Sequence, residues 1–405
     1  MPSAATPDVT APRALRWPWE FLFDQTSRST RILDAVLVGL IPFRSLPGLP
    51  SAIPPGDLFG VVLVVLALFR RPTHRLGTVS WLIPVSMALL GYLVVVSMVN
   101  DVSWTRRAVR LTILVVLSFQ VGTGRIDIRS GLRGLAFFLV ANGVLFVAGV
   151  APNNYGGNLT GWLDDKNRAG MVIGVDGLLA ACLAFRRRWI LPAIALTALG
   201  VWLTGSRTTL AGFGLALVWM LVRPSLHGLV TKVAVVVPGI WILNYIEVNF
   251  ARAGEFASRV GSDALRERIA DAVAAKLALT PWYGGGLGTA SVEMDGATWF
   301  FHSSYDGLRQ EGGWVLLVLV TAVTVWLGLR PMKREVTGFD QLAVEAATIV
   351  QLVCAWKLGE VFLSTSSFIL LGYALQLYLR DHGTRVLDDQ ERVLQAYASH
   401  RRDRS

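Results

Sequence analysis

Long apolar runs separated by short polar connections extend through most of the chain. The runs are about 16 to 22 residues long, the length a helix needs to cross a hydrocarbon core about 30 Å thick. They predict spans near residues 32–50, 57–70, 80–99, 107–123, 131–150, 169–185, 189–204, 208–222, 229–249, 303–329, 340–360 and 362–380. The pattern therefore predicts an all-α polytopic membrane protein with about twelve transmembrane helices.

These spans divide the chain into five parts. Residues 1–30 are polar, contain proline and lack the apolar core and cleavage site of a secretory signal, so we expect a cytoplasmic tail there. The other parts are helices one to nine within 31–249, a long extracytoplasmic loop at 250–302, helices ten to twelve within 303–380 and a cytoplasmic tail at 381–405.

Basic residues gather in the loops that this topology assigns to the cytoplasmic side. They are Arg70, Arg71, Arg75, Arg125, Arg129, Arg186, Arg187, Arg188, Arg223, Lys232, Arg330, Lys333 and Arg334. The tail that follows Arg380 is also rich in arginine. An even number of spans therefore satisfies the positive-inside rule at both ends.

The composition agrees with a membrane protein. Hydrophobic residues make up 53% of the chain and charged residues only 16%, against roughly 25% in soluble proteins. The formal charge of +10 follows from the basic loops, so we expect no nucleic acid partner. Cys182 and Cys354 lie inside apolar runs and give neither a metal-ligand spacing nor a disulfide framework, so we expect no metal and no cofactor.

A second set of basic residues lies on the opposite, extracytoplasmic side, against the usual bias. It comprises Arg106, Arg107, Arg110, Lys166, Arg168, Arg207, Arg252, Arg259, Arg266, Arg268 and Lys276. Scatter in topology explains any one of these positions, but the whole set favours a cationic surface. Such a surface is what a lipid-linked phosphate or diphosphate requires.

Arg207 follows a sharp Gly-Ser turn between two predicted helices. The hydroxyls of Thr204, Ser206, Thr208 and Thr209 flank it. Together they predict an oxyanion pocket, whereas snorkelling of one arginine at a helix end is the alternative.

The long loop contains a predicted amphipathic helix at 263–279. Its apolar stripe consists of Leu265, Ile269, Val273 and Leu277. At 100° per residue, Arg266 falls within this stripe and is expected to face the membrane-embedded body as a ligand-binding residue, whereas Arg268 faces water or pairs locally. The Gly-rich run 284–288 allows close backbone approach, or is a flexible connection.

His302 is the extracytoplasmic candidate for proton transfer, because the other four histidines fall in cytoplasmic loops or the tail. The amino end of a helix favours the neutral imidazole that a general base needs. Tyr305 and Arg309 recur at helical spacing and are expected to share a face with it. An ordinary interfacial histidine is the alternative.

Two further groups carry polar side chains near predicted helix ends. Lys166, Asn167 and Arg168 follow two aspartates, and either hold the substrate or belong to a helix cap. Lys357 and Glu360 are expected to form an internal ion pair.

Four of these segments together resemble the O-antigen ligase and O-antigen polymerase family of membrane glycan transferases. They are the G-x-x-x-x-K-N-R-A run at Gly161 to Ala169, the G-S-R turn at Arg207, the stretch from Arg266 through Pro281 to Gly286, and His302 and Tyr305 followed by Glu311 and Gly313. The chain departs from the family at Ser303, where Asn is frequent.

The resemblance implies inverting, metal-independent transfer from undecaprenyl diphosphate to an acceptor hydroxyl outside the bacterial inner membrane. The acceptor is a glycan, a lipid or a protein. Arg207 and Arg266 would bind the diphosphate and His302 would act on the hydroxyl. The expected substrate-binding residues are Lys166, Asn167, Arg168, Ser206, Tyr305 and Arg309.

A transporter or flippase for lipid-linked glycans is the alternative to an enzyme. Asp34 and Asp176 lie within predicted spans, and buried acids mark ion or proton paths in transporters. The chain shows no convincing internal repeat of the kind many transporters have.

Overall fold

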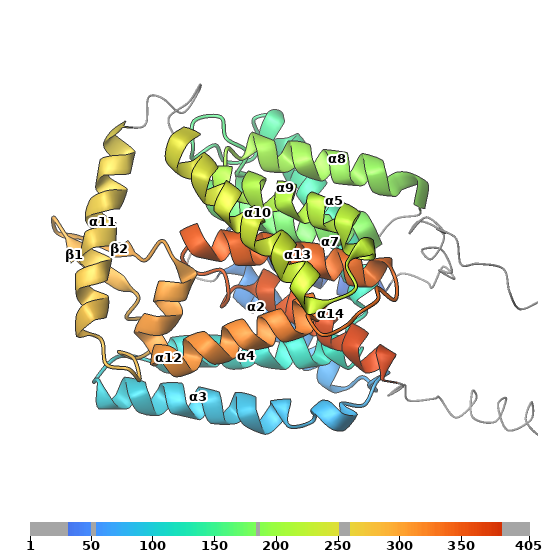
Figure 1. The fold of residues 1–405 in the computed structure, drawn as a ribbon, viewed down its shortest axis with the longest axis horizontal. Coiled ribbons are helices and arrows are strands. Elements are labelled where there is room, and N and C mark those ends of the chain that lie inside the picture. The colour runs from blue at the N-terminus through green and yellow to red at the C-terminus, as the bar shows by residue number, and fades with distance from the viewer. Residues whose placement is uncertain (1–30, 50–53, 184–186, 251–259, 383–405) are drawn as a thin grey trace, which may run out of the picture.

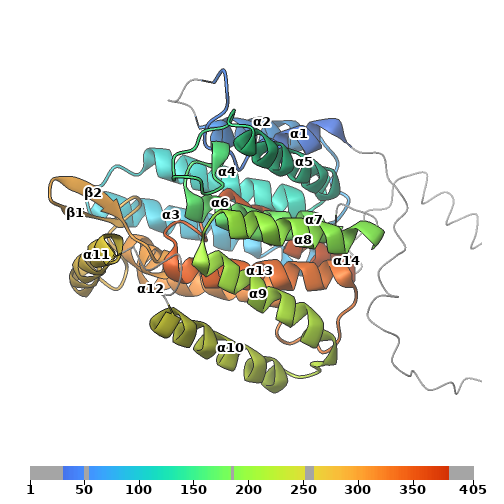
Figure 2. The same cartoon turned by 90° about the horizontal axis from the view of Figure 1, so that it is seen from above.

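The computed structural model describes residues 31–49, 54–183, 187–250 and 260–382, and is essentially all-α. The predicted tail at 1–30 lies outside these ranges, as do residues 383–405 of the tail predicted at 381–405, and Arg186, Arg252 and Arg259. Figure 1 shows the helices as one bundle, and Figure 2 shows α1, α2 and α5 on one side of it, α9 and α10 on the other, and α13 between them.

A helix lies at every one of the twelve predicted positions. The helices are α1 (Ile32–Leu40), α2 (Pro55–Leu68), α3 (Leu82–Val99), α4 (Thr105–Gly122), α5 (Ile128–Val147), α6 (Lys166–Val172), α7 (Leu178–Leu183), α8 (Arg187–Leu203), α9 (Arg207–Val222), α10 (Leu229–Phe250), α11 (Val260–Leu279), α12 (Ser304–Thr324), α13 (Phe339–Lys357) and α14 (Thr365–Asp381). A π turn at Ile173–Gly177 joins α6 to α7, so these two occupy one predicted position, and α11 is the loop helix.

Five segments of the described chain are long and apolar enough to cross a membrane. They are Gly77–Val99, Ile128–Val147, Arg207–Ser225, Ser304–Leu329 and Phe339–Lys357. Large apolar side chains stay exposed on the outside of the bundle, with Met87, Val99 and Phe137 between 67% and 69% exposed. These features indicate a multi-pass membrane protein, because lipid tails solvate such surfaces and water does not.

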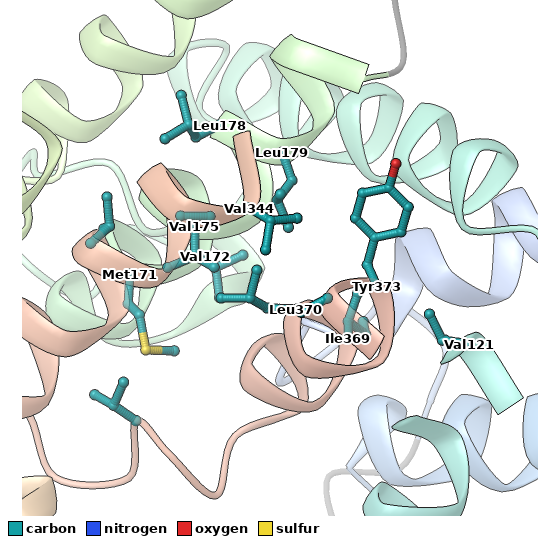
Figure 3. Close-up of a cluster of buried hydrophobic side chains, with 14 of the residues drawn as sticks. Val121, Met171, Val172, Val175, Leu178, Leu179, Val344, Ile369, Leu370 and Tyr373 are labelled. Atoms are coloured by element: carbon teal, nitrogen blue, oxygen red, sulfur yellow. The ribbon is translucent and has the colours of Figure 1, made fainter. Parts of the chain in front are cut away.

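The helix at the centre is α13, of which 78% is buried. Its Val344 lies in a cluster with Leu179 of α7 and with Ile369, Leu370 and Tyr373 of α14 (Figure 3). Packing on all sides explains why α13 has apolar residues around most of its circumference.

The long loop predicted at 250–302 contains α11 and a β-hairpin, which lie together at one end of the bundle (Figure 1). Strand β1 (Ser291–Met294) pairs antiparallel with β2 (Ala297–Phe300). The predicted stripe of α11 is confirmed, since Ile269 and Val273 are buried against Val292 and Phe301. Arg268 is confirmed as a local partner, because it pairs with Asp295 at 2.8 Å.

Helix α12 is interrupted after its second turn, which the sequence pattern did not predict. Gly313 has φ +64° and ψ −160°, a conformation that is essentially restricted to glycine. The Gly-rich run packs into the interruption, where Gly285 N donates to Gln310 O at 2.6 Å and Gly286 N donates to Glu311 O at 3.0 Å. Close approach, and not flexibility, is therefore the role of these glycines.

The other end of the bundle carries the basic residues assigned to the cytoplasmic side, and many of them are paired with acids. Arg223 and Glu345 form a fully buried pair at 2.8 Å. Arg330 pairs with Asp381 at 2.6 Å. Extensive pairing at this end leaves the ends of α4, α6 and α9 as the place to look for a site.

Candidate functional site

An ion network lies where the first turn of α4 meets α12 and the connection between α13 and α14. Arg107 donates to both oxygens of Glu311, at 3.0 Å from Nε and 2.8 Å from Nη2, and also bonds Glu360. Arg110, one turn along α4, approaches Glu360 at 3.6 Å and Asp57 at 3.5 Å. A planar guanidinium suits this bridging position because its donors spread as a fork.

The interruption in α12 is what positions Glu311. The carboxylate is 1% exposed and accepts Gly288 N at 3.2 Å in addition to Arg107. Tyr92 of α3 ties the same region together by donating to Tyr283 O at 2.8 Å. A buried carboxylate with this many donors is held rigidly, so Glu311 fixes the direction in which Arg107 points.

Glu360 is the centre of an arginine cluster, which we define as Arg44, Arg107, Arg110 and Arg168. Its side chain lies in the connection before α14 and is 47% exposed. Burial alone raises the pKa of Glu360, but Arg107, Arg110 and Arg44 outweigh this effect and hold the pKa below its usual value. Arg168 joins the cluster, since Arg44 and Arg110 repel its charge and Glu360 attracts it.

One donor of the cluster is unused within the described part of the chain, because the buried Nε of Arg168 has no hydrogen-bond partner there. The Nε of Arg110 faces Asp57 at 3.5 Å. Arg168 uses another nitrogen to donate to Pro42 O at 3.0 Å. Buried donors of this kind are normally satisfied, so the cluster has capacity for an anionic ligand.

A cavity of about 100 Å³ adjoins the cluster. Arg107, Glu311 and Glu360 line it on one side, and Ser304 and Leu308 of α12 on the other. A volume of this size fits a small polar group such as one phosphate or one hydroxyl with its water.

His302 lies immediately before α12 and is exposed. A Cβ at Gly359 would overlap the carbonyl oxygen of its neighbour Phe301, so His302 is next to the connection that carries Glu360. Ser303 Oγ accepts Asp306 N at 3.2 Å and caps α12, which gives a reason for serine where the family often has asparagine.

Tyr305 and Arg309 each contact other residues of the bundle. Tyr305 packs against Phe362 and donates to Leu352 O at 3.2 Å inside the bundle. The guanidinium of Arg309 stacks over Trp314 at 4.9 Å. Both contacts therefore anchor α12. The contact of Arg309 with Trp314 is a cation–π pair, and Trp is typical of membrane interfaces.

Arg207 begins α9 and is half-buried. Because α9 and α13 are antiparallel neighbours, with Thr209 Oγ1 at 3.5 Å from Cys354 Sγ, Arg207 lies at the same end as the arginine cluster. Three of the neighbouring hydroxyls take part in hydrogen bonds within the chain: Ser206 Oγ bonds Thr209 Oγ1 at 2.9 Å, and Thr204 bonds Val201 O at 2.7 Å.

Lys166, Asn167 and Arg168 belong in part to a helix cap, which was the alternative to a substrate-binding role. Asp165 accepts Asn167 N at 2.8 Å and Arg168 N at 3.0 Å. Tyr155 donates to the same carboxylate at 2.7 Å, and this hydrogen bond with partial burial raises the pKa of Tyr155 to about 12. The ring of Tyr155 lies 6.0 Å from Lys166 Nζ.

Arg266 lies on α11, but its side chain is outside the described part of the structure. The neighbouring Lys276 donates to Thr289 O at 2.9 Å and Ser291 O at 2.6 Å, which fixes the hairpin to α11. Desolvation lowers the pKa of Lys276 from its usual value.

Sequence reasoning noted Arg107, Glu311 and Glu360 separately and did not connect them. Glu311 and Glu360 lie 204 and 253 residues after Arg107 along the chain, so no local spacing links them to it. The hairpin had a signal that was missed, since Asp295 and Gly296 form a two-residue turn with positive φ between two alternating segments.

Among the described residues no three His, Cys, Asp or Glu side chains are grouped as metal ligands would be. Comparisons with protein-family models, with curated proteins and with solved structures give no match for this chain.

Proposed function

We propose that this chain crosses the bacterial inner membrane twelve times and transfers a glycan from undecaprenyl diphosphate to an acceptor hydroxyl on the extracytoplasmic side. The resemblance to O-antigen ligases and polymerases motivates the reaction class. The observation that carries it is the arginine cluster around Glu360 at one end of an apolar bundle, where the buried Nε of Arg168 has no hydrogen-bond partner in the described chain. Arginine forks bind phosphate oxygens while keeping their charge.

The alternation of the helices supports the proposal of twelve spans. Residues 44, 57, 107, 168 and 360 lie at or beside the ends of different helices, yet they meet at one end. An even number of crossings explains this meeting and keeps both basic sets on their expected sides.

The proposed step is a displacement at the anomeric carbon. His302 takes the proton of the acceptor hydroxyl while the oxygen of that hydroxyl bonds to the anomeric carbon. The bond between this carbon and the diphosphate breaks, and its electron pair leaves on the phosphate oxygen. In-line attack inverts the anomeric centre. Arg207, Arg266 and the arginine cluster stabilise the charge on the departing diphosphate. Lys166, Asn167 and Ser206 lie close to this end and contribute to binding.

The test is release of undecaprenyl diphosphate by purified protein in detergent with EDTA present, using glycan, lipid and protein acceptors. We expect acceptor-dependent release by the wild type and a loss of about 10²-fold to 10⁴-fold in His302→Ala, since general base catalysis contributes that much. Arg207→Ala and Arg168→Ala are expected to be impaired as well.

Matched controls come from the same residue types elsewhere. His227→Ala changes an exposed histidine at the other end, and Arg268→Ala changes an exposed arginine paired with Asp295. Both are expected to retain activity. Full activity in His302→Ala and Arg207→Ala, or no release with any acceptor class, contradicts the proposal.

A transporter or flippase is the second candidate, and Asp176 favours it. This carboxylate is fully buried at the π turn, and one oxygen accepts Ser366 Oγ at 2.5 Å while the other has no hydrogen-bond partner in the described chain. Asp34 gives no such support, because Arg70 at 2.5 Å and Asp127 N at 2.8 Å satisfy it. Movement of a lipid-linked glycan across vesicles without release of the carrier would favour this candidate.

A further inference from the structure

A groove separates α2 from α4 at the outer end of the bundle. It has a volume of about 260 Å³, larger than the cavity beside Glu311. Asp57 and Gly60 form one wall, and Arg106, Val109 and Ile113 form the other. We call this feature the α2–α4 groove.

The α2–α4 groove is polar at its outer end and apolar below. Arg106 and Arg110 come from the first two turns of α4, and Val109 and Ile113 continue along the same helix. Val109 is 54% exposed, and apolar side chains on the outer surface of α2 are exposed as well. A cationic rim above an apolar wall is the arrangement that matches a lipid with an anionic headgroup.

Gly60 leaves the groove open. A Cβ built on this buried glycine meets no atom within 4 Å, whereas a Cβ on Gly56, one turn earlier, would overlap the carbonyl oxygen of Ile41. Gly56 therefore lets α2 pack closely on the end of α1, and no such contact requires Gly60. Glycine is unfavourable inside a helix, so its effect at position 60 is to leave space.

The charges at the rim indicate which lipid fits. Arg110 is paired with Asp57 at 3.5 Å and with Glu360 at 3.6 Å, so Arg106 supplies the one rim charge left for a ligand. A phosphodiester has a single negative charge, whereas a diphosphate has more.

We propose that the α2–α4 groove binds an anionic phospholipid, with the phosphodiester on Arg106 and one acyl chain against Val109 and Ile113. The lipid comes from the surrounding membrane. This inference is independent of the proposed function, because binding here requires no glycan transfer.

The experiment measures binding to purified, delipidated protein in detergent. Native mass spectrometry counts bound phosphatidylglycerol, and the shift in thermal unfolding temperature reports its affinity, since a ligand of the folded state stabilises it. Phosphatidylcholine, inorganic phosphate and undecaprenyl diphosphate are the comparison ligands. We expect one phosphatidylglycerol per chain and an upward shift, with no shift from inorganic phosphate.

Two variants test the place of binding. Gly60→Leu places a side chain in the groove from a position where a Cβ meets no atom within 4 Å, and Arg106→Gln removes one rim charge. Each is expected to weaken phosphatidylglycerol binding at least tenfold. The control is Gly91→Leu on α3, another helical glycine with nothing within 4 Å of a Cβ, which is expected to bind normally.

Three outcomes overturn the proposal. Equal binding by wild type and Gly60→Leu, with Arg106→Gln also unchanged, removes the groove as the site. Equal shifts from phosphatidylcholine and phosphatidylglycerol remove the anionic requirement. A shift from undecaprenyl diphosphate alone, lost in Gly60→Leu, assigns the groove to the isoprenoid carrier and not to a phospholipid.

Discussion

At the scale of single residues, Arg107 has the most constrained environment of the arginine cluster. Its guanidinium is shared between Glu311, which is buried, and Glu360, which is partly exposed. Removing a charge from water is costly, and the pair offsets that cost only while both partners and their hydrogen bonds are present. Loss of either partner therefore affects the stability of the protein as well as the binding of any ligand.

Glu311→Gln is predicted to destabilise the protein. Breaking a buried ion pair on one side costs about 3–5 kcal/mol, and the remaining pair with Glu360 puts the expected loss near the lower figure. Unfolding in mixed detergent micelles, followed by circular dichroism, measures it. Asp306→Asn, on the first turn of the same helix, is the control and is expected to cost less than about 1 kcal/mol.

Tyr155 is predicted to ionise unusually late. Its hydrogen bond to Asp165 favours the neutral phenol and raises the pKa to about 12. The stability this bond adds is complete below the ordinary tyrosine pKa near 10 and is lost as the pH rises toward 12. Tyrosinate absorbance, taken as the difference between each protein and its Tyr155→Phe version, measures the titration.

The matched variants for this titration are Asp165→Asn and Asp164→Asn. Asp165→Asn removes the charge that receives the hydroxyl proton and is expected to return the pKa of Tyr155 toward 10. Asp164 acts only through its charge, so Asp164→Asn is expected to change it less. An unchanged titration in Asp165→Asn would show that the hydrogen bond is not the cause.

At the scale of elements, local patterns predicted the helices and missed what depends on distant contacts. The apolar stripe of α11 was readable because Ile269 and Val273 obey helical spacing. The interruption at Gly313 was not, because the Gly-rich run that fills it lies earlier in the chain. For the same reason the arginines were found, but Glu360 was paired with Lys357 and not with them.

Gly313→Ala is predicted to be among the most damaging small substitutions in the described chain. The backbone conformation is one that only glycine adopts readily, and a Cβ would overlap the carbonyl oxygen of Trp282. We expect a loss of at least about 3 kcal/mol, from strain and overlap combined. Gly214→Ala, at a helical glycine of α9 with open space around it, is expected to be neutral or stabilising in the same unfolding experiment.

At the scale of the whole molecule, both ends of the bundle carry basic residues. One end is extensively paired, and the other holds the arginine cluster, in which the Nε of Arg168 has no hydrogen-bond partner in the described chain. Between them lie apolar surfaces that remain exposed on α3 and α5. From the positive-inside rule we predict that the paired end faces the cytoplasm.

Cysteine labelling is predicted to report this orientation. Both native cysteines are buried, so single exposed cysteines supply the signal. In intact cells a membrane-impermeant maleimide is expected to label Asp101→Cys and Asp295→Cys at the outer end. His227→Cys and Glu335→Cys at the other end are expected to react only after permeabilisation. Labelling of all four in intact cells, or the reverse pattern, contradicts the topology.

The position of Glu360 late in the chain has a consequence for biogenesis. Arg44, Arg107, Arg110 and Arg168 emerge from the ribosome long before the carboxylate around which they gather. During synthesis these arginines enter the membrane interface without that counter-ion, and the insertion machinery or surrounding lipid headgroups must accommodate their charge. The outer end of the protein therefore reaches its final electrostatic state only when the last two helices have been inserted.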